Sequence, residues 1–133
     1  MNEGEVAAGL AATPGYRYAD RVGGRLHVAG QVPHDRSGLL VGIGDPAEQC
    51  RQCLRNLLTL ARHHGFALGD IHRLTIYVVG DRAALGRAWD VVVDLFGGSV
   101  PPATLLGVAV LGHEDQLVEI DAEIDREPTP LPR

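Results

Sequence analysis

The 133-residue chain contains no lysine, so its twelve basic side chains are all arginines, and its formal net charge is −5. These arginines are scattered along the sequence, and aromatic residues make up only 5% of it. A nucleic-acid surface usually shows a basic stripe, and a platform for single strands needs aromatic rings on which bases stack. The sequence therefore argues against a nucleic-acid partner.

Long apolar runs are also missing, since no segment approaches the roughly 20 residues that span a bilayer. The first residues, MNEGEVAAGLAATPG, carry two glutamates and no basic side chain, unlike a secretory signal. We therefore expect no membrane partner and a cytoplasmic location. The length suits one domain over residues 1–133, with a flexible arm at about 1–13 and a flexible proline-rich tail at 127–133.

Only two cysteines are present, Cys50 and Cys53, and this Cys-x-x-Cys spacing can mark a redox site or half of a zinc site. No second pair accompanies it, and both residues lie in a helical pattern that Asp45 can cap and Gly65 can end. The apolar stripe of this helix is Cys50, Cys53, Leu54, Leu57, Leu58 and Ala61. We therefore assign both cysteines to the core.

Histidines are no better placed for a metal. His63 and His64 are adjacent at the end of this helix, so we expect them to point in different directions and to be solvated. The sequence predicts neither a metal nor a cofactor.

Three further segments have clear patterns. Strands are expected at 16–22 and 25–32, joined at Gly23-Gly24, and a third at 70–80, which is rich in β-branched residues. A second helix is expected from about 82 to 96, with Asp81 as its cap. The single tryptophan, Trp89, lies on the apolar side of this helix, where it either packs in the core or forms the wall of a site.

The last patterned segment ends in an acidic strand. Residues 103–111 are almost all apolar, which is typical of a strand buried on both faces, and 112–115 interrupt the run. From 116 to 125 apolar and acidic residues alternate, so the two segments together predict a hairpin with one acidic face. That face is either a solvated surface or a site or subunit interface that uses a carboxylate. The acidic residues are Glu119, Asp121, Glu123 and Asp125.

The element order is thus ββαβαββ, which predicts an α+β fold with two helices on one face of a mixed sheet. Two helices cannot cover both faces, and a sheet with one uncovered, half-apolar face commonly closes by association.

Over roughly residues 16–124 the chain resembles the RidA family, also called YjgF, of enamine and imine deaminases. The resemblance implies a chorismate-mutase-like homotrimer whose clefts are each built by two chains and act on a small-molecule metabolite without a cofactor. The matching pieces are Tyr16 with Ala19 and Val22-Gly23-Gly24; Val28 to Pro33; Ser37-Gly38; Gln49 and Asn56-Leu57; Asp70-Ile71 with Thr75 to Val78; Pro101 to Thr104; and Val118 to Ala122.

The resemblance also implies roles for individual residues. Glu119 would position the water that attacks the imine carbon, Gly30 and Gln31 would contribute to the pocket, and Tyr16 would close it. The backbone near Leu105 would complete the site. The arginine that holds the substrate carboxylate in these deaminases is missing, because its place falls on Ala103 or, with the register shifted by one, on Thr104.

This departure leaves two hypotheses. One is a divergent hydrolase in which Glu119 and a water act on a neutral or differently charged imine or enamine, in apolar surroundings formed by Ala103, Leu105, Leu106 and Trp89. The other is a non-catalytic trimer that has lost deaminase activity, whose cleft only binds a metabolite or is vestigial. Arginines that could replace the missing one from another direction are Arg17, Arg73 and Arg87.

Overall fold

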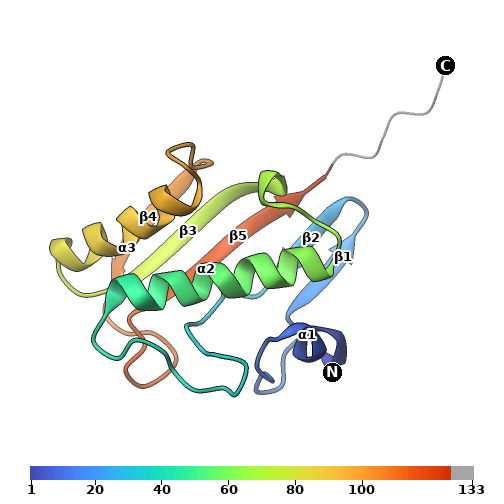
Figure 1. The fold of residues 1–133 in the computed structure, drawn as a ribbon, viewed down its shortest axis with the longest axis horizontal. Coiled ribbons are helices and arrows are strands. Elements are labelled where there is room, and N and C mark those ends of the chain that lie inside the picture. Colours follow the sequence, from blue (N-terminus) through green and yellow to red (C-terminus); the bar gives the residue numbers. More distant parts are fainter. Residues whose placement is uncertain (127–133) are drawn as a thin grey trace.

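The computed structural model describes residues 1–126, which form one sheet with two long helices on one side (Figure 1). The expected element order is confirmed, with one additional short helix at the start. The elements are α1 (Glu3–Ala8), β1 (Ala19–Val22), β2 (Arg25–Val28), α2 (Pro46–His63), the 3-10 turn η1 (Leu68–Asp70), β3 (Ile71–Val79), α3 (Arg82–Leu95), β4 (Ala103–Val108) and β5 (Val118–Asp125).

The strands lie in the order β1-β2-β5-β3-β4. All neighbours are antiparallel except β3 and β4, which are parallel, so the sheet is mixed as predicted. The predicted hairpin between the last two strands is wrong, because β3 separates β4 from β5. A helix links β3 to β4, and such a crossover places the second strand parallel to the first. The chain must then pass β3 to reach the other side of it.

This order also corrects the burial expected for β4. We expected both faces to be covered, but β4 is an edge strand whose residues are all half-buried or exposed. Its apolar composition therefore does not come from a central position. Leu106, with 41% of its surface exposed, is one of the large apolar side chains that this protomer leaves open to solvent.

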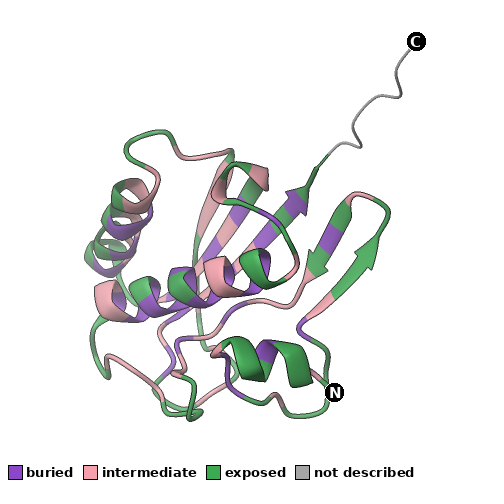
Figure 2. Cartoon of the chain, turned by 45° about the vertical axis from the view of Figure 1, so that its right-hand side comes forward, coloured by how far each residue is buried: buried purple, intermediate pink, exposed green. Residues whose placement is uncertain are grey.

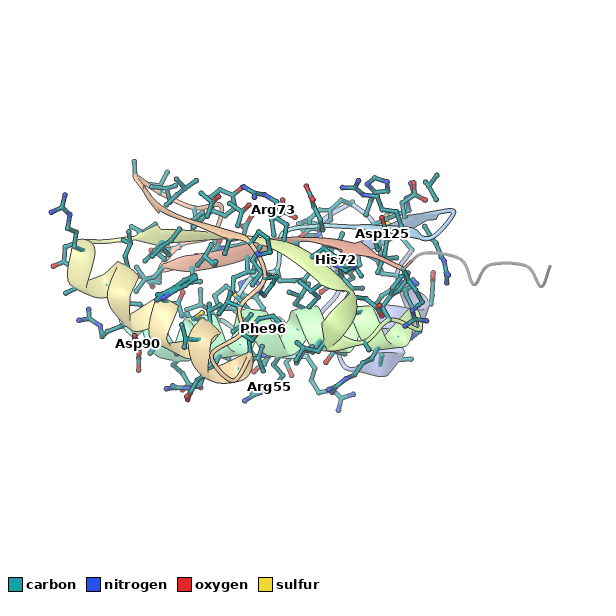
Figure 3. The ribbon with its side chains drawn as sticks, turned by 90° about the horizontal axis from the view of Figure 1, so that it is seen from above. Arg55, His72, Arg73, Asp90, Phe96 and Asp125 are labelled. Carbon is teal, nitrogen blue, oxygen red and sulfur yellow. The ribbon has the colours of Figure 1, made fainter. Side chains whose placement is uncertain are left out.

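The core lies between the sheet and the two long helices (Figure 2). The alternation predicted for β5 is confirmed, since its four apolar residues are buried against the helices and the acidic ones are half-buried or exposed. Both α2 and α3 lie on the same side of the sheet. The other face of the sheet carries the layer of side chains seen above it in Figure 3. We call this second surface the open face.

Both helix caps are as predicted. The Asp45 carboxylate accepts a hydrogen bond from the Glu48 backbone N–H (3.1 Å), and Asp81 does the same for Ala84 (2.9 Å). The Glu48 side chain pairs with Arg51 instead of turning back to complete a capping box. Gly65 follows α2 with a φ of +85°, a left-handed conformation that suits glycine.

The two cysteines of α2 are fully buried, as expected. Burial raises the pKa of the Cys50 thiol to about 12, against a small opposing effect of Arg51. The pKa of Cys53 is raised well above its ordinary value, first by burial and then by the charges of Cys50 and Glu119. Both side chains therefore act as small apolar groups in the core.

The N-terminal arm is not loose, which corrects our expectation. α1 packs beside the end of α2, and Leu10 and Ala11 after it are buried at 2% and 7% exposure. The Asn2 side chain further ties the segment to the chain near β1 through hydrogen bonds to Thr13 and Tyr18. A short sequence without periodicity gave no sign of this packing. The predicted tail, 127–133, lies outside the described residues.

Two amides of α2 connect the loops around the site. Gln49, fully buried, donates to the carbonyls of Gly42 and Asp115 and accepts from the backbone N–H of Leu117 at 2.7 Å. Asn56 donates to the carbonyls of Val32 and His34 at 2.9 Å each.

In residues 1–126 no helix combines the length and apolar character needed to cross a membrane.

Candidate functional site

Glu119 lies on the open face of β5, between two residues that are fully buried on the opposite side. Its side chain is half-buried and rests against the backbone of Gly30, where a Cβ atom would come within 2.4 Å of Oε2. A side chain at position 30 would displace the carboxylate from its present place. The proximity of Gly30 and Glu119, which we expected only from the family resemblance, follows from a bridge between Gln31 and Ile120.

That bridge consists of two backbone hydrogen bonds, from Gln31 N–H to the Ile120 carbonyl (2.7 Å) and from Ile120 N–H to the Gln31 carbonyl (3.1 Å). The Gln31 side chain is itself buried at 2% exposure and donates to the Ala29 carbonyl (2.8 Å). The chain after β2 is therefore fixed beside β5 although regular strand structure stops at Val28, earlier than predicted.

Gln116 is the hydrogen-bond partner of Glu119. Its Nε2 donates to Glu119 Oε1 (3.3 Å) and to the Val118 carbonyl (3.0 Å), while its Oε1 accepts from the His113 backbone N–H (3.1 Å). The side chain is 3% exposed, so these bonds are sheltered from water. Sequence reasoning missed Gln116, and a polar residue at the start of an apolar alternation was the only available signal.

Tyr16, Gly30 and Gln31, all predicted as site residues, line one pocket of about 340 Å³. Partial burial raises the pKa of the Tyr16 phenol, and the nearby charge of Glu119 raises it further. Tyr16 is therefore a neutral hydrogen-bond donor at neutral pH. The other lining residues are Ala11, Ala12, Thr13, Pro14, Tyr18, Val32, His34, Gly38, Asn56 and His113.

The sequence did not reveal that two histidines would meet in this pocket. The rings of His34 and His113 lie edge to face with their centroids 4.5 Å apart, although 79 residues of sequence separate them. Burial lowers the pKa of His34, the charge of His113 lowers it further, and Asp35 opposes both effects. His34 is thus held in its neutral form, which can accept or donate a proton.

The register of β4 decides which of the two residues expected at the arginine's place, Ala103 or Thr104, lies on the open face. Thr104 pairs with Thr75, and Leu106 pairs with Tyr77, which in turn pairs with Glu119. Residues directly opposite in a sheet share a face, so Thr104 and Leu106 lie on the open face with Glu119.

Ala103 and Leu105 instead pair with buried residues of β3 and pack against the core. Our expectation that their side chains would border Glu119 is therefore wrong. Of Ala103 and Thr104, it is Thr104 that lies on the open face.

Arg73 of β3 reaches this position. Its Nη2 donates to Thr104 Oγ1 at 2.8 Å, and its guanidinium group is exposed (Figure 3). Within residues 1–126 it forms no ion pair, so it is free to meet an anion. Arg17 instead pairs with Asp20, and Arg87 lies on α3 in the helix layer.

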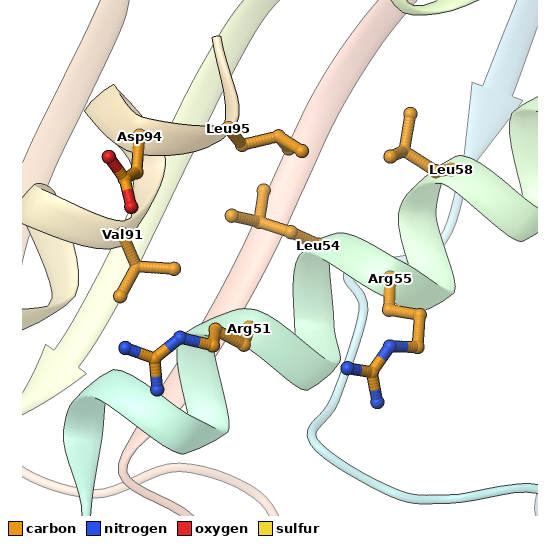
Figure 4. A pocket seen from close by; sticks show the side chains of 7 residues that line it. All are labelled: Arg51, Leu54, Arg55, Leu58, Val91, Asp94 and Leu95. Atoms are coloured by element: carbon orange, nitrogen blue, oxygen red, sulfur yellow. The ribbon is translucent and has the colours of Figure 1, made fainter. Parts of the chain in front are cut away.

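Trp89 does not take part in this surface, because it lies on α3 and packs against the core on the covered side of the sheet. A separate groove of about 360 Å³ lies between α2 and α3 (Figure 4). It contains none of the predicted site residues, and Arg51 at its edge is already paired with Glu48 at 3.0 Å. The lining residues are Arg51, Leu54, Arg55, Leu58, Val91, Asp94 and Leu95.

Comparison with known proteins gives a consistent result. Residues 7–124 match the family described as Endoribonuclease L-PSP. The chain is 33% identical over 108 residues to a RutC family protein of Pyrococcus horikoshii, a match covering 80% of this chain and 83% of that protein.

Solved structures agree with this family. A putative endoribonuclease from Thermotoga maritima has a TM-score of 0.79 at 29% identity, over 90% of this chain and 92% of that one. The YjgF protein of E. coli has a TM-score of 0.74 at 26% identity, over 89% and 93%. The fold, the element order and these matches together place the chain in the RidA (YjgF) family, whose family model carries the name Endoribonuclease L-PSP.

Proposed function

We propose that this protein hydrolyses an imine or enamine metabolite, with Glu119 as the group that positions and activates water. Family membership supports a deaminase-like role on small molecules. The observation that carries the finer proposal is the seating of the Glu119 carboxylate, held on one side by Gln116 and on the other by the bare backbone of Gly30.

The chemistry needs one carboxylate and one water. Glu119 accepts a proton as the water oxygen forms a bond to the carbon of a protonated imine. The product of this step is an amino alcohol with an uncharged hydroxyl group on the former imine carbon. Glu119 then returns the proton to nitrogen, and the carbon–nitrogen bond breaks with its electrons on nitrogen. As the carbonyl forms, the hydroxyl proton passes to Glu119 and from there to the departing ammonia, so ammonium and a carbonyl compound leave and the carboxylate is regenerated.

Distance across the sheet supports a site that two chains complete. Thr104 is two strands and two residues away from Glu119, which corresponds to about 12 Å at ordinary sheet spacings. A metabolite of a few carbon atoms cannot contact both residues of one protomer. We therefore propose that the open faces meet in a homotrimer, with the β4 edge of one chain beside Glu119 of its neighbour.

The substrate class follows from the same positions. A threonine cannot form the two parallel hydrogen bonds that an arginine makes to a carboxylate, and losing such a charge-assisted contact costs about 1.5–3 kcal/mol. Arg73 offers a cation at the side of Thr104, displaced from the usual direction. We propose an imine that is neutral at this end, or one whose anionic group lies further out, near Arg73.

The second candidate is a trimer that binds a metabolite without turning it over. Thr104 at the place of the substrate-binding arginine favours this alternative. An endoribonuclease, which the names of several relatives suggest, has less support, because the net charge is −5 and aromatic residues are few.

One experiment separates the first two candidates. Imines are generated in place from amino acids and from amines that lack a carboxylate, and ammonia release is followed with wild type, Arg73→Ala and Thr104→Arg. The proposal expects wild type to prefer neutral or extended substrates and Thr104→Arg to gain on short 2-imino acids. Failure of wild type on every imine, together with saturable binding of one of them, would favour the non-catalytic trimer.

A further inference from the structure

A second group of side chains with metal-binding chemistry lies outside the candidate site, where α1 meets the end of α2. Glu5, His63 and His64 each offer one ligand atom, and these three atoms all lie within 4.8 Å of one another. Glu5 Oε2 and His64 Nε2 are 2.9 Å apart. The sequence alone gave no reason to include Glu5, because its segment was expected to be a loose arm.

The backbone explains why adjacent histidines converge here. His63 is the last residue of α2, and His64, with φ −92° and ψ 10°, has already left helical geometry. The two rings can therefore turn to the same side, and their centroids are 4.9 Å apart at an angle of 84°. Our expectation that the rings would point in different directions is wrong for this reason.

The fit between α1 and His63 is close. A Cβ atom at position 4 would lie 2.7 Å from His63 Nε2, so the ring rests on the bare backbone of Gly4. With any other residue at position 4, this ring would have to move. Gly4 thereby serves the cluster in the same way that Gly30 serves Glu119.

The electrostatics favour a cation. The carbonyl end of α2 carries the negative pole of the helix, and Glu5 adds a carboxylate with little exposure. Two arginines oppose this effect: Arg62 lies in the last turn of α2, and Arg21 Nη1 donates to the His64 carbonyl at 3.4 Å and so contacts the backbone.

We propose that Glu5, His63 and His64 bind a zinc ion, with water as the fourth ligand. Two imidazoles and one carboxylate are a ligand set that Zn²⁺ takes in proteins. Zinc bonds of about 2.0–2.1 Å bring tetrahedral ligand atoms to about 3.4 Å from one another, which needs only small side-chain rotations here. This site depends on no activity of the pocket.

The consequence of metal binding is mechanical. α1 leads directly into Ala11–Tyr16, which forms one wall of the pocket that contains Gly30 and Gln31. A zinc ion that joins α1 to α2 therefore holds this wall in place. Zinc at this position stabilises the N-terminal segment more than the rest of the fold.

The test is a titration of metal-free, full-length protein with zinc chloride by calorimetry, together with Co²⁺ absorption as a report of tetrahedral geometry. We expect one ion per chain. Glu5→Gln, His63→Gln and His64→Gln each weaken binding at least about tenfold, because each removes a direct ligand. His27→Gln is the matched control, since His27 is exposed on β2 outside the cluster.

A second readout covers the case in which a variant loses stability. Zinc should slow proteolysis of wild type at residues 1–12 and leave cleavage of Glu5→Gln unchanged. Binding by the three ligand variants that equals wild type, or an equal loss in His27→Gln, would mean adventitious zinc only and would overturn the proposal. Absence of binding by wild type would overturn it as well.

Discussion

The carboxylate of Glu119 lies against Gly30, so closely that a Cβ atom at position 30 would be 2.4 Å from Oε2 and 3.0 Å from Cδ. Residues 30 and 119 are far apart in sequence, yet the lack of a side chain at position 30 leaves the space that the Glu119 carboxylate occupies. Position 30 must be bare for the carboxylate to keep its hydrogen bond to Gln116.

Gly30→Ala should therefore reduce catalysis more than stability. The methyl group displaces a flexible carboxylate by about an ångström, and such a shift of a reacting group can cost about a hundredfold in rate. The free energy of unfolding should change little, because the side chain can swing outward. The control is Gly69→Ala, since a Cβ there meets nothing within 4 Å. Equal rates for both variants would show that the seating of Glu119 does not matter.

Association through the open face is the second prediction. Leu106 is 41% exposed on this face, in register with Tyr77 and Glu119. Leu106→Arg would place an unpaired charge in a trimer interface, and we expect it to give monomers in light scattering at micromolar concentration. Ala83→Arg, on the exposed side of α3, should remain trimeric. A monomeric wild type would contradict the assembly itself.

Most of the fold was predictable because each element carried its own local signal. Asp45 and Asp81 mark helix starts, and the alternation from Val118 to Ile124 fixes which side of β5 is buried. Strand order was not predictable in this way. An apolar run such as β4 has the same sequence pattern whether the strand lies at the centre of a sheet or at its edge.

The site was predicted only in part, for a related reason. The family resemblance pointed to Glu119, Gly30 and Tyr16, and the structure places Tyr16 and Gly30 in one pocket with Glu119 against Gly30. Nothing local showed that His34 and His113 would line the same pocket. The uncertainty between Ala103 and Thr104 could be decided only by pairing with β3, because one residue of register reverses the face.

Both cysteine thiols should be unreactive in the folded protein. Cys50 and Cys53 have no exposed surface, and burial raises their pKa, so neither forms appreciable thiolate at pH 8. We expect a thiol reagent to label them only as fast as the protein unfolds, and both at once in denaturant. Rapid labelling of native protein would contradict their place in the core.

Acid should destabilise the pocket through His34. Its folded-state pKa is lowered, whereas an unfolded histidine titrates near 6.5, so the unfolded chain takes up the proton first. The free energy of unfolding should fall as pH drops through about 6.5 and level off below the folded pKa.

Denaturant unfolding of wild type and His34→Gln at pH 7.5 and 5.0 measures this effect. His113 and Asp35 are present beside His34 in both proteins, so the difference between the two proteins reports on His34. An identical loss of stability in both would exclude His34 as its source.

Replacement of one oxygen tests the central claim most directly. Glu119→Gln keeps the shape of the side chain but removes the base, so ammonia release from the best imine substrate should fall by about 10²–10⁴-fold, the usual contribution of a positioned base. The oligomeric state and the melting temperature should stay within error of wild type. Turnover by Glu119→Gln at the wild-type rate, in protein that is folded and assembled, would contradict the account.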